Sequence, residues 1–358
     1  MRIFQSTIRN PQSQIRNRFT IQMPRVFFFF FVVAATLSLP SWSHAEDSLV
    51  VYSGRAERLI QPVLDAFQAE SGINVQMLTA DSTALINRLQ MEGARTPADV
   101  LITNDAGTLE RARELQLLQP ATIPGIEETI PSRFRAPDNT WIGLSGRIWV
   151  IVYNTTMVGP GDISSILDLA EPKWRGKIAI PSAGSVYLQT GVSVIRAVKG
   201  DEVTTAFLRG LKDNAGSLVY GKNRQIVAAV ARGEVAAGPV NHYYINRHLA
   251  KHPNAPIASL PADQGEQGMG VVLNAAGIGV TVQTKHLEQA RALVRFLISP
   301  KGQRMFAHVN KEYPLNPHVT AAPELLPLQS IQVARVPLSR LAQLRDPTMT
   351  VIEEVGLR

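Results

Sequence analysis

The chain has 358 residues, of which 45% are apolar and 18% charged, and it contains no cysteine. This composition indicates a globular protein, with enough chain for one large domain or two of ordinary size. The absence of cysteine excludes disulfides, thiolate metal sites, a cysteine nucleophile and a lipid-modified N-terminal cysteine.

The formal net charge of +7 comes mostly from the N-terminal segment. Residues 1–45 carry five arginines and no acidic residue, whereas the remainder has 31 basic and 29 acidic side chains. A balance so close to neutrality gives little support for a surface that follows a phosphate backbone. We therefore expect no nucleic-acid partner.

An apolar run of 14 residues at positions 26–39 follows Arg25. It is short for a membrane-spanning helix, which needs about 20 apolar residues. Ser43 and Ala45 are small residues at the two positions that a signal peptidase reads. We predict a signal peptide over residues 1–45 with cleavage near Ala45, and an uncleaved anchor is the alternative.

The stretch before Met23 is long for a leader, so Met1 and Met23 are both candidate start residues. No second long apolar run follows the leader. An exported chain without a lipid anchor suits a compartment that retains free proteins. We therefore expect a periplasmic protein of a Gram-negative bacterium.

The rest of the chain alternates short apolar runs with helical patterns, which is typical of α/β proteins. Strands are predicted at residues 48–52, 74–78, 98–103, 177–181 and 234–240. Helices are predicted at residues 55–70, 85–91, 107–117, 187–198, 201–211, 224–233 and 287–298. The tail from about residue 321 is predicted to be helical only in patches.

Two further segments have the pattern of strands that cross between lobes. Residues 141–154 form one long extended stretch, and residues 269–273 read as a second crossing strand. We therefore predict one lobe from residues 46–147 and 274–358, and another from residues 148–273. Two such lobes place a ligand cleft at the hinge. Two docked domains without a functional cleft are the alternative.

Tyr243 and Tyr244 are adjacent at a point where a predicted strand gives way to a helix. A Tyr-Tyr pair by itself is usually one core ring and one surface ring. Here, however, the sequence around it resembles the periplasmic ferric-ion-binding proteins of iron ABC transporters. The segments that carry this resemblance are 51–55 (VYSGR), 98–103 (ADVLIT), 144–147 (LSGR), 220–223 (YGKN), 243–244 (YY) and 312–317 (EYPLNP).

The resemblance implies a type II periplasmic-binding-protein fold and Fe³⁺ as the ligand. In that family the two adjacent tyrosines bind the metal through phenolate oxygens, which implies this role for Tyr243 and Tyr244. One branch adds a third tyrosine on the loop that enters a helix of the second lobe, and Tyr187 matches it. The resemblance also implies delivery to an inner-membrane ABC permease with its ATPase, and we expect a monomer.

The first loop departs from the family pattern. Many members have a histidine ligand directly after the position of Arg55, where this chain has Ala56, and some have a glutamate where it has Asn104. What remains resembles the members that use three tyrosines and a carbonate or bicarbonate anion held by an arginine of the first loop. Arg55 matches that arginine, and an ion pair with Glu57 or Asp105 is the alternative.

The residue chemistry agrees with this ligand set. Fe³⁺ is a hard cation that prefers anionic oxygen donors, and three phenolates balance its charge. A bound cation favours deprotonation of tyrosine, whose pKa is otherwise near 10. A planar anion suits the rigid fork of a guanidinium. Asp105 is a candidate to hydrogen-bond a ligand tyrosine or the anion, and Asn223 and Asn241 are candidates to donate to the anion or to fix the tyrosine loop. Helix capping is the alternative for Asp105 and Asn223.

The best hypothesis is therefore a non-enzymatic binding protein that captures Fe³⁺ and delivers it to a permease. Two alternatives stay open, a receptor for a small organic anion and a ligand-sensing partner of a membrane sensor kinase. No catalytic constellation competes with these readings, since the sequence offers no paired nucleophile and base. His248 and His252 have a metal-type spacing, but an exposed helix face explains them better.

Overall fold

The computed structural model describes residues 48–357, so the signal peptide predicted over residues 1–45 lies outside the described residues. The strands are β1 (Leu49–Ser53), β2 (Val75–Thr79), β3 (Val100–Thr103), β4 (Leu118–Gln119), β5 (Trp141–Asn154), β6 (Ile180–Pro181), β7 (Val219–Tyr220), β8 (Ala237–Asn241), β9 (Ile257–Leu260), β10 (Val272–Thr281) and β11 (Tyr313–Pro314). The helices are α1 (Glu57–Ser71), α2 (Ser82–Glu92), α3 (Ala106–Glu114), α4 (Ile126–Thr129), α5 (Val186–Ala215), α6 (Asn223–Ala231), α7 (His242–Leu249), α8 (Leu287–Ile298), α9 (Pro300–Asn310) and α10 (Leu341–Val355). Within this part of the chain, no helix combines the length and apolar character needed to cross a membrane.

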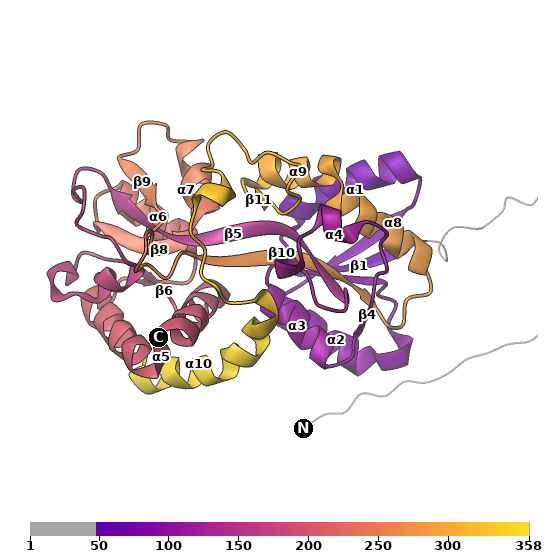
Figure 1. The fold of residues 1–358 in the computed structure, drawn as a ribbon, viewed down its shortest axis with the longest axis horizontal. Helices are drawn as coiled ribbons and strands as arrows, with labels where there is room; N and C mark the ends of the chain where they lie inside the picture. The colour runs from indigo at the N-terminus through magenta and orange to yellow at the C-terminus, as the bar shows by residue number, and fades with distance from the viewer. Residues whose placement is uncertain (1–47, 358) are drawn as a thin grey trace, which may run out of the picture. The chain divides into compact units, whose positions relative to one another are not determined.

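The strands build two lobes that share β5 and β10 (Figure 1). In the first lobe, β1 pairs in parallel with β2 and β3, and β10 runs antiparallel between β3 and β5. In the second lobe, the far end of β5 pairs antiparallel with β8 and β9. The predicted α/β class and the two-lobed arrangement with two crossing strands are confirmed.

The crossing strand β5 has the bounds that the sequence predicts. Its 14 residues are buried except for the half-buried Tyr153, as expected for a strand that is covered on both faces. The second crossing strand differs from the prediction, because β10 begins at Val272 and runs on to Thr281 rather than ending at residue 273. The two helices predicted at residues 187–198 and 201–211 are confirmed, because α5 consists of two helical stretches that meet at Gly200, whose φ of +83° and ψ of 175° are not helical.

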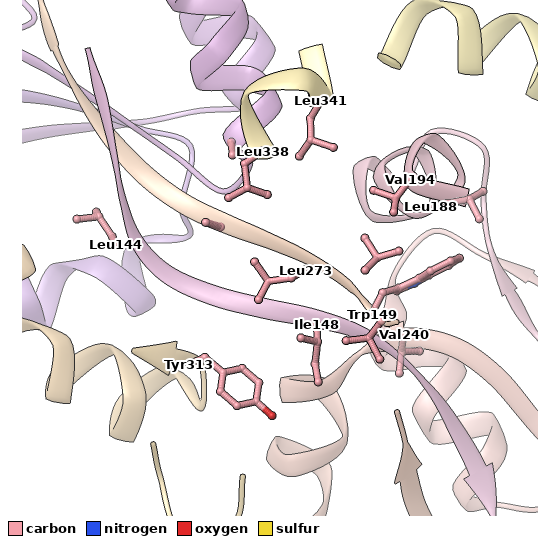
Figure 2. Packing of buried hydrophobic residues seen from close by; sticks show 14 of the residues in the cluster. Leu144, Ile148, Trp149, Leu188, Val194, Val240, Leu273, Tyr313, Leu338 and Leu341 are labelled. Atoms are coloured by element: carbon pink, nitrogen blue, oxygen red, sulfur yellow. The ribbon is translucent and has the colours of Figure 1, made fainter. Parts of the chain in front are cut away.

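The hydrophobic core continues from one lobe into the other along the crossing strands. Leu144, Ile148 and Trp149 of β5 and Leu273 of β10 are buried there (Figure 2). The C-terminal helix α10 packs on α5 and also on α3, so the tail contacts elements of both lobes. Polar contacts fasten it, since the Thr348 and Ser193 hydroxyls lie 3.1 Å apart and Lys212 Nζ donates to the carbonyl oxygen of Val355 at 2.8 Å.

Candidate metal centre

The adjacent tyrosines lie in the first turn of α7. Strand β8 ends at Asn241, which pairs with Trp149 of β5, and α7 begins at the next residue. The ring centroids of Tyr243 and Tyr244 are 4.4 Å apart, with an angle of 35° between the ring planes. Tyr243 is buried and Tyr244 is half-buried. The end of β8 therefore carries both rings to the start of one helix.

Tyr187 joins them from the first turn of α5. The Tyr243 hydroxyl donates to the Tyr187 hydroxyl oxygen at 3.3 Å, and the ring centroids of Tyr187 and Tyr244 are 6.5 Å apart. The structure thus brings together the three tyrosines that the sequence predicts as ligands, although 56 residues separate Tyr187 from Tyr243. Both helices present their N-terminal ends, where the helix dipole stabilises negative charge.

The tyrosines border a cavity of about 400 Å³ between the lobes, which Tyr187 and Tyr244 line directly. Its first-lobe lining is Gly54, Arg58, Asp81, Ser82, Thr83, Asn104, Asp105 and Thr108. Its second-lobe lining also includes Ser185, Val186, Gly221, Lys222, Asn223 and Arg224. A ligand in this cavity therefore contacts both lobes, as the hinge cleft predicted from the sequence requires.

The surroundings keep the Tyr243 and Tyr244 phenols neutral while no cation is present. Burial raises the pKa of Tyr243 well above its ordinary value near 10, and the neighbouring Tyr187 and Tyr244 raise it further, whereas Arg147 lowers it. Burial and the proximity of Tyr187 raise the pKa of Tyr244 to about 12. A bound cation supplies the opposite charge that makes deprotonation favourable. Tyr243 and Tyr244 are therefore protonated in the metal-free protein, and a highly charged cation can displace their protons and bind the phenolates.

Two arginines lie beside the tyrosines, and neither was predicted from the sequence to be a site residue. The Arg147 guanidinium lies 5.2 Å from the centroid of the Tyr187 ring, and that of Arg247 lies 4.6 Å from the Tyr243 ring. Arg147 is buried, and its Nη2 has no hydrogen-bond partner among the described residues. Arg147 belongs to the segment 144–147 (LSGR), which is one of the segments that carry the family resemblance. The resemblance could have pointed to Arg147, but no role was predicted for it.

Arg55 lies elsewhere than the sequence analysis expected. Its guanidinium is fully buried and bonds both carboxylate oxygens of Glu312, at 2.8 and 3.0 Å. Its Nη1 donates to Ser145 Oγ at 3.3 Å. The structure therefore does not bring Arg55 into the lining of the cavity, and its ion-pair partner is neither Glu57 nor Asp105. The reason is a long-range contact, because Glu312 is 257 residues away in the sequence.

Asp105 takes the helix-capping position that was its alternative. Its Oδ1 accepts from the Thr108 amide at 2.9 Å and thereby caps α3. Its Oδ2 accepts from Thr190 Oγ1 at 3.1 Å and from the Asn274 side chain, and lies 3.9 Å from Arg147 Nη2. Asp105 therefore connects a first-lobe helix with α5 of the second lobe and with crossing strand β10.

Asn223 and Asn241 lie behind the tyrosine turn. Both side chains are buried, and Asn223 Oδ1 accepts from the Asn241 backbone amide at 3.4 Å. Asn223 also lines the cavity. Asn241 Nδ2 is buried without a hydrogen-bond partner among the described residues. Asn223 thus helps to position the start of α7, and the unpaired Asn241 and Arg147 groups leave two buried donors beside the tyrosines.

Histidine and carboxylate groups do not form a competing metal site. Within residues 48–357, no three His, Cys, Asp or Glu side chains are placed to hold a metal ion. His242, the nearest histidine, accepts from the Ile148 amide at Nδ1 and donates from Nε2 to the carbonyl oxygen of Lys311. Burial lowers the pKa of His242 to about 4, so this ring is neutral and already fully hydrogen-bonded. The donors that fit a cation here are the three phenol oxygens.

Comparison with known proteins shows the family of this chain. The family model for bacterial extracellular solute-binding proteins matches residues 49–308. The chain belongs to this family. Like the solute-binding proteins of the family, it has two lobes around a cleft, and such proteins work with ABC transporter permeases.

Individual relatives of this solute-binding protein are named for iron. It is 30% identical to iron uptake protein A1 of Synechocystis sp., over 87% of this chain and 88% of the relative. It is 28% identical to the major ferric iron-binding protein of Neisseria meningitidis, over 91% and 98% of the two chains. The resemblance to ferric-ion-binding proteins seen in the sequence is thus confirmed.

Solved structures extend the similarity to the fold. The ferric binding protein from Campylobacter jejuni matches with a TM-score of 0.81 at 27% identity, over 87% of this chain and 100% of that one. A Trichodesmium protein (IdiA, FutA) in complex with iron and citrate ligands matches with a TM-score of 0.79 at 30% identity, over the same shares of the two chains.

Proposed function

We propose that this protein captures Fe³⁺ in the cleft through the phenolate oxygens of Tyr187, Tyr243 and Tyr244. It then delivers the metal as cargo to an inner-membrane ABC permease and its ATPase. We also propose that the protein is located in the periplasm, that it is exported through a cleavable signal peptide, and that it is a monomer. The single observation that carries it is the clustering of three tyrosines from two helix N-termini beside a cavity between the lobes, which Tyr187 and Tyr244 line.

Charge and hardness favour Fe³⁺ over other cations at this site. Three phenolates carry three negative charges, which match a trivalent ion, and their oxygens are hard donors. A divalent ion compensates less of the cost of removing three phenol protons, a cost that the raised pKa values of Tyr243 and Tyr244 increase. The names of the relatives supply an independent argument, because they are iron uptake and ferric iron-binding proteins.

We expect an oxyanion to bind Fe³⁺ together with the tyrosines in this cleft, and carbonate is our candidate. Three phenolates leave part of the coordination sphere of Fe³⁺ open, and a planar bidentate anion suits the remainder. Cations of the cavity, rather than the paired Arg55, supply the compensating charge. Arg58 lines the cavity from the first lobe, and Arg147 has an unpaired Nη2 beside Tyr187.

Capture and release follow from the division of the site between the lobes. The tyrosine lobe holds all three metal ligands, so the metal is expected to bind there first. Closure then brings Gly54, Arg58 and Asn104 of the first lobe over the site and expels water. Protonation or loss of the anion reopens the coordination sphere and favours release.

The test is optical, because iron–phenolate bonds absorb visible light. The purified protein, given ferric citrate and bicarbonate, is expected to turn orange-red. Tyr243→Phe and Tyr244→Phe are expected to weaken or abolish the visible band. Tyr153→Phe is the matched control, since Tyr153 lies in β5 and does not line the cavity. An unchanged band in either ligand variant would exclude that residue as a ligand.

A receptor for a small organic anion is the second candidate, because one observation favours it. Arg58, Lys222 and Arg224 all line the cavity, and they attract anions whether or not a metal is present. Binding of citrate by the metal-free protein, without a visible band when iron is added, would support this candidate instead. Citrate binding that requires iron would support the metal site.

A further inference from the structure

A second cavity, of about 470 Å³, lies apart from the tyrosines and shares no lining residue with the metal cleft. It is partly open to solvent and is bordered by residues 132–135 and 137, by Leu273 of β10 and by residues 333–339 of the tail. Figure 2 shows Leu273 and Leu338 near one another beside the crossing strands. The volume falls in the range of small-molecule sites.

The tail wall of this cavity is held firmly. The Val271 amide donates to the Gln332 carbonyl oxygen at 2.9 Å, and the Ala334 amide donates to the Val271 carbonyl oxygen at 3.0 Å. Gly270 has a φ of +81°, and a Cβ there would lie 2.6 Å from the Val333 carbonyl carbon. Only glycine allows so close an approach at that conformation. The tail is therefore fitted closely to Gly270 and Val271, directly before β10, and forms one wall of the cavity.

The opposite wall is also fixed, and the floor is apolar. The Ala136 amide donates to the Trp141 carbonyl oxygen at 3.0 Å, and Arg135 Nε donates to the Ile130 carbonyl oxygen at 3.1 Å. Phe134, Leu273 and Leu338 are buried within the lining, and the apolar surface that stays accessible belongs to Pro137, Val333, Val336 and Pro337. A ligand that covers these four residues gains stability in proportion to the apolar area removed from water.

The lining carries cations without acidic counterparts. Three arginines line the cavity, Arg133, Arg135 and Arg335, and no Asp or Glu does. Only Arg135 has an acidic neighbour, the exposed Glu127 at 3.8 Å. The Arg133 and Arg335 side chains form no ion pair or hydrogen bond with any residue of the described range 48–357. The Arg133 guanidinium lies 4.6 Å from the centroid of the Phe134 ring. The N–H groups of both guanidiniums can thus donate to an anion beside an apolar surface.

We propose that this cavity binds a small monocarboxylate with a compact apolar body, such as a medium-chain aliphatic acid. The carboxylate accepts hydrogen bonds from Arg133 and Arg335, whose forked donors match its two oxygens. The apolar body covers Pro137, Val333, Val336 and Pro337. A polyanion such as citrate leaves these apolar residues exposed, and an organic cation meets three like charges, so neither fits the site.

Calorimetric titration of the metal-free full mature protein with octanoate tests the proposal, with octanamide as the neutral analogue. We expect saturable binding of one octanoate, and binding of octanamide weaker by about tenfold or more. The double variant R133A/R335A is expected to lose about tenfold in octanoate affinity. The matched control R295A/R304A also removes two exposed arginines, here from α8 and α9, and is expected to bind octanoate like the unmodified protein.

Three outcomes would overturn the proposal: no saturable binding at millimolar octanoate, equal affinity for octanamide, or full affinity in R133A/R335A. An equal loss in R295A/R304A would show a general charge effect and would overturn it as well. Circular dichroism verifies that each variant is folded. Because the titration contains no iron, its result is independent of the visible-band test, so failure of one proposal is distinguishable from failure of the other.

Discussion

Two buried clusters of this molecule each contain an arginine, and they differ in how that arginine is neutralised. Arg55 bonds both carboxylate oxygens of Glu312. Arg147 has an Nη2 without a hydrogen-bond partner, and the nearest oxygen of Asp105 is 3.9 Å away. A paired buried charge destabilises the fold when its partner is removed, whereas a buried guanidinium with an unpaired donor beside three phenols can compensate negative charge that forms when a ligand binds. The comparison separates a structural arginine from a binding one.

The largest expected effect is the loss of a metal ligand from the under-neutralised cluster. Tyr187→Phe removes the phenol that α5 contributes and leaves the ring in place. Mutation of groups that merely support metal ligands costs 10–100-fold in metal affinity, so we expect this variant to bind Fe³⁺ more than about 100-fold more weakly. Competition with citrate, followed by the visible band, measures the affinity.

Tyr313→Phe is the matched control for Tyr187→Phe. Tyr313 is buried, and its ring packs against His242 at a centroid distance of 4.8 Å, outside the lining of the metal cavity. Its affinity for Fe³⁺ is expected to be unchanged. If Tyr187→Phe retained full affinity, the site would have only the twin tyrosines, and α5 would have no part in metal binding.

The next largest expected effect is a loss of stability when the ion pair between Arg55 and Glu312 is broken. Arg55→Met leaves the Glu312 carboxylate buried without its partner, which costs about 3–5 kcal/mol of unfolding free energy. Chemical denaturation of the metal-free protein measures this loss. The double variant R55M/E312L removes both charges and is expected to recover most of it. If Arg55→Met unfolded normally but lost its dependence on bicarbonate, Arg55 would be the anion-binding residue after all.

The pH dependence of this pair has a definite sign. Burial by itself raises the pKa of Glu312, but Arg55, Ser145 and Arg147 outweigh it and the pKa is lowered. A group with a lowered pKa in the folded state stabilises the fold above its unfolded-state pKa, and this stability is lost as the pH falls through the folded-state pKa. The stability difference between the protein and Glu312→Gln is therefore expected to shrink in acid. A difference that grew in acid would contradict the pairing.

Arg147→Gln tests the other arginine and is expected to act on metal binding. Arg147 lowers the pKa of Tyr243, so its loss makes the phenol harder to deprotonate. Protons then compete better with Fe³⁺, and the iron-binding curve is expected to move to higher pH, with about tenfold weaker binding at neutral pH. Arg304→Gln, on the exposed face of α9, is the control. A curve that did not move would leave Arg147 without a role in the site.

The two crossing strands differ in how well their bounds could be predicted from the sequence. Strand β5 is one long apolar run, so its bounds at Trp141 and Asn154 were predicted correctly. Strand β10 was predicted too short because it continues through Ala275, Ala276 and Gly277, which have little strand preference of their own. Local pattern decides such elements, and it is weak where small residues are packed between other strands.

In the candidate site, the long-range contacts of the arginines could not be predicted from local sequence patterns. The tyrosines were identified through a resemblance, and the structure brings them together as that resemblance implies. The partner of Arg55 was not predicted, because Glu312 is 257 residues away and no spacing encodes their contact. The burial of Arg147, and the absence of a carboxylate to neutralise it fully, are likewise products of tertiary packing rather than of any segment.

The smallest expected effect concerns the contact that joins the lobes beside Arg147. Thr190 of α5 donates to Asp105 at 3.1 Å, so this bond exists only when the lobes are in the present arrangement. Thr190→Val removes it, at a cost of about 1 kcal/mol, and shifts the balance toward a more open cleft. Transfer of iron to an external chelator is then expected to be about fivefold faster. Thr204→Val is the control, because Thr204 bonds the Gly200 carbonyl oxygen within the same lobe. Equal transfer rates in the two variants would mean that the Asp105 cluster caps α3 without holding the lobes together.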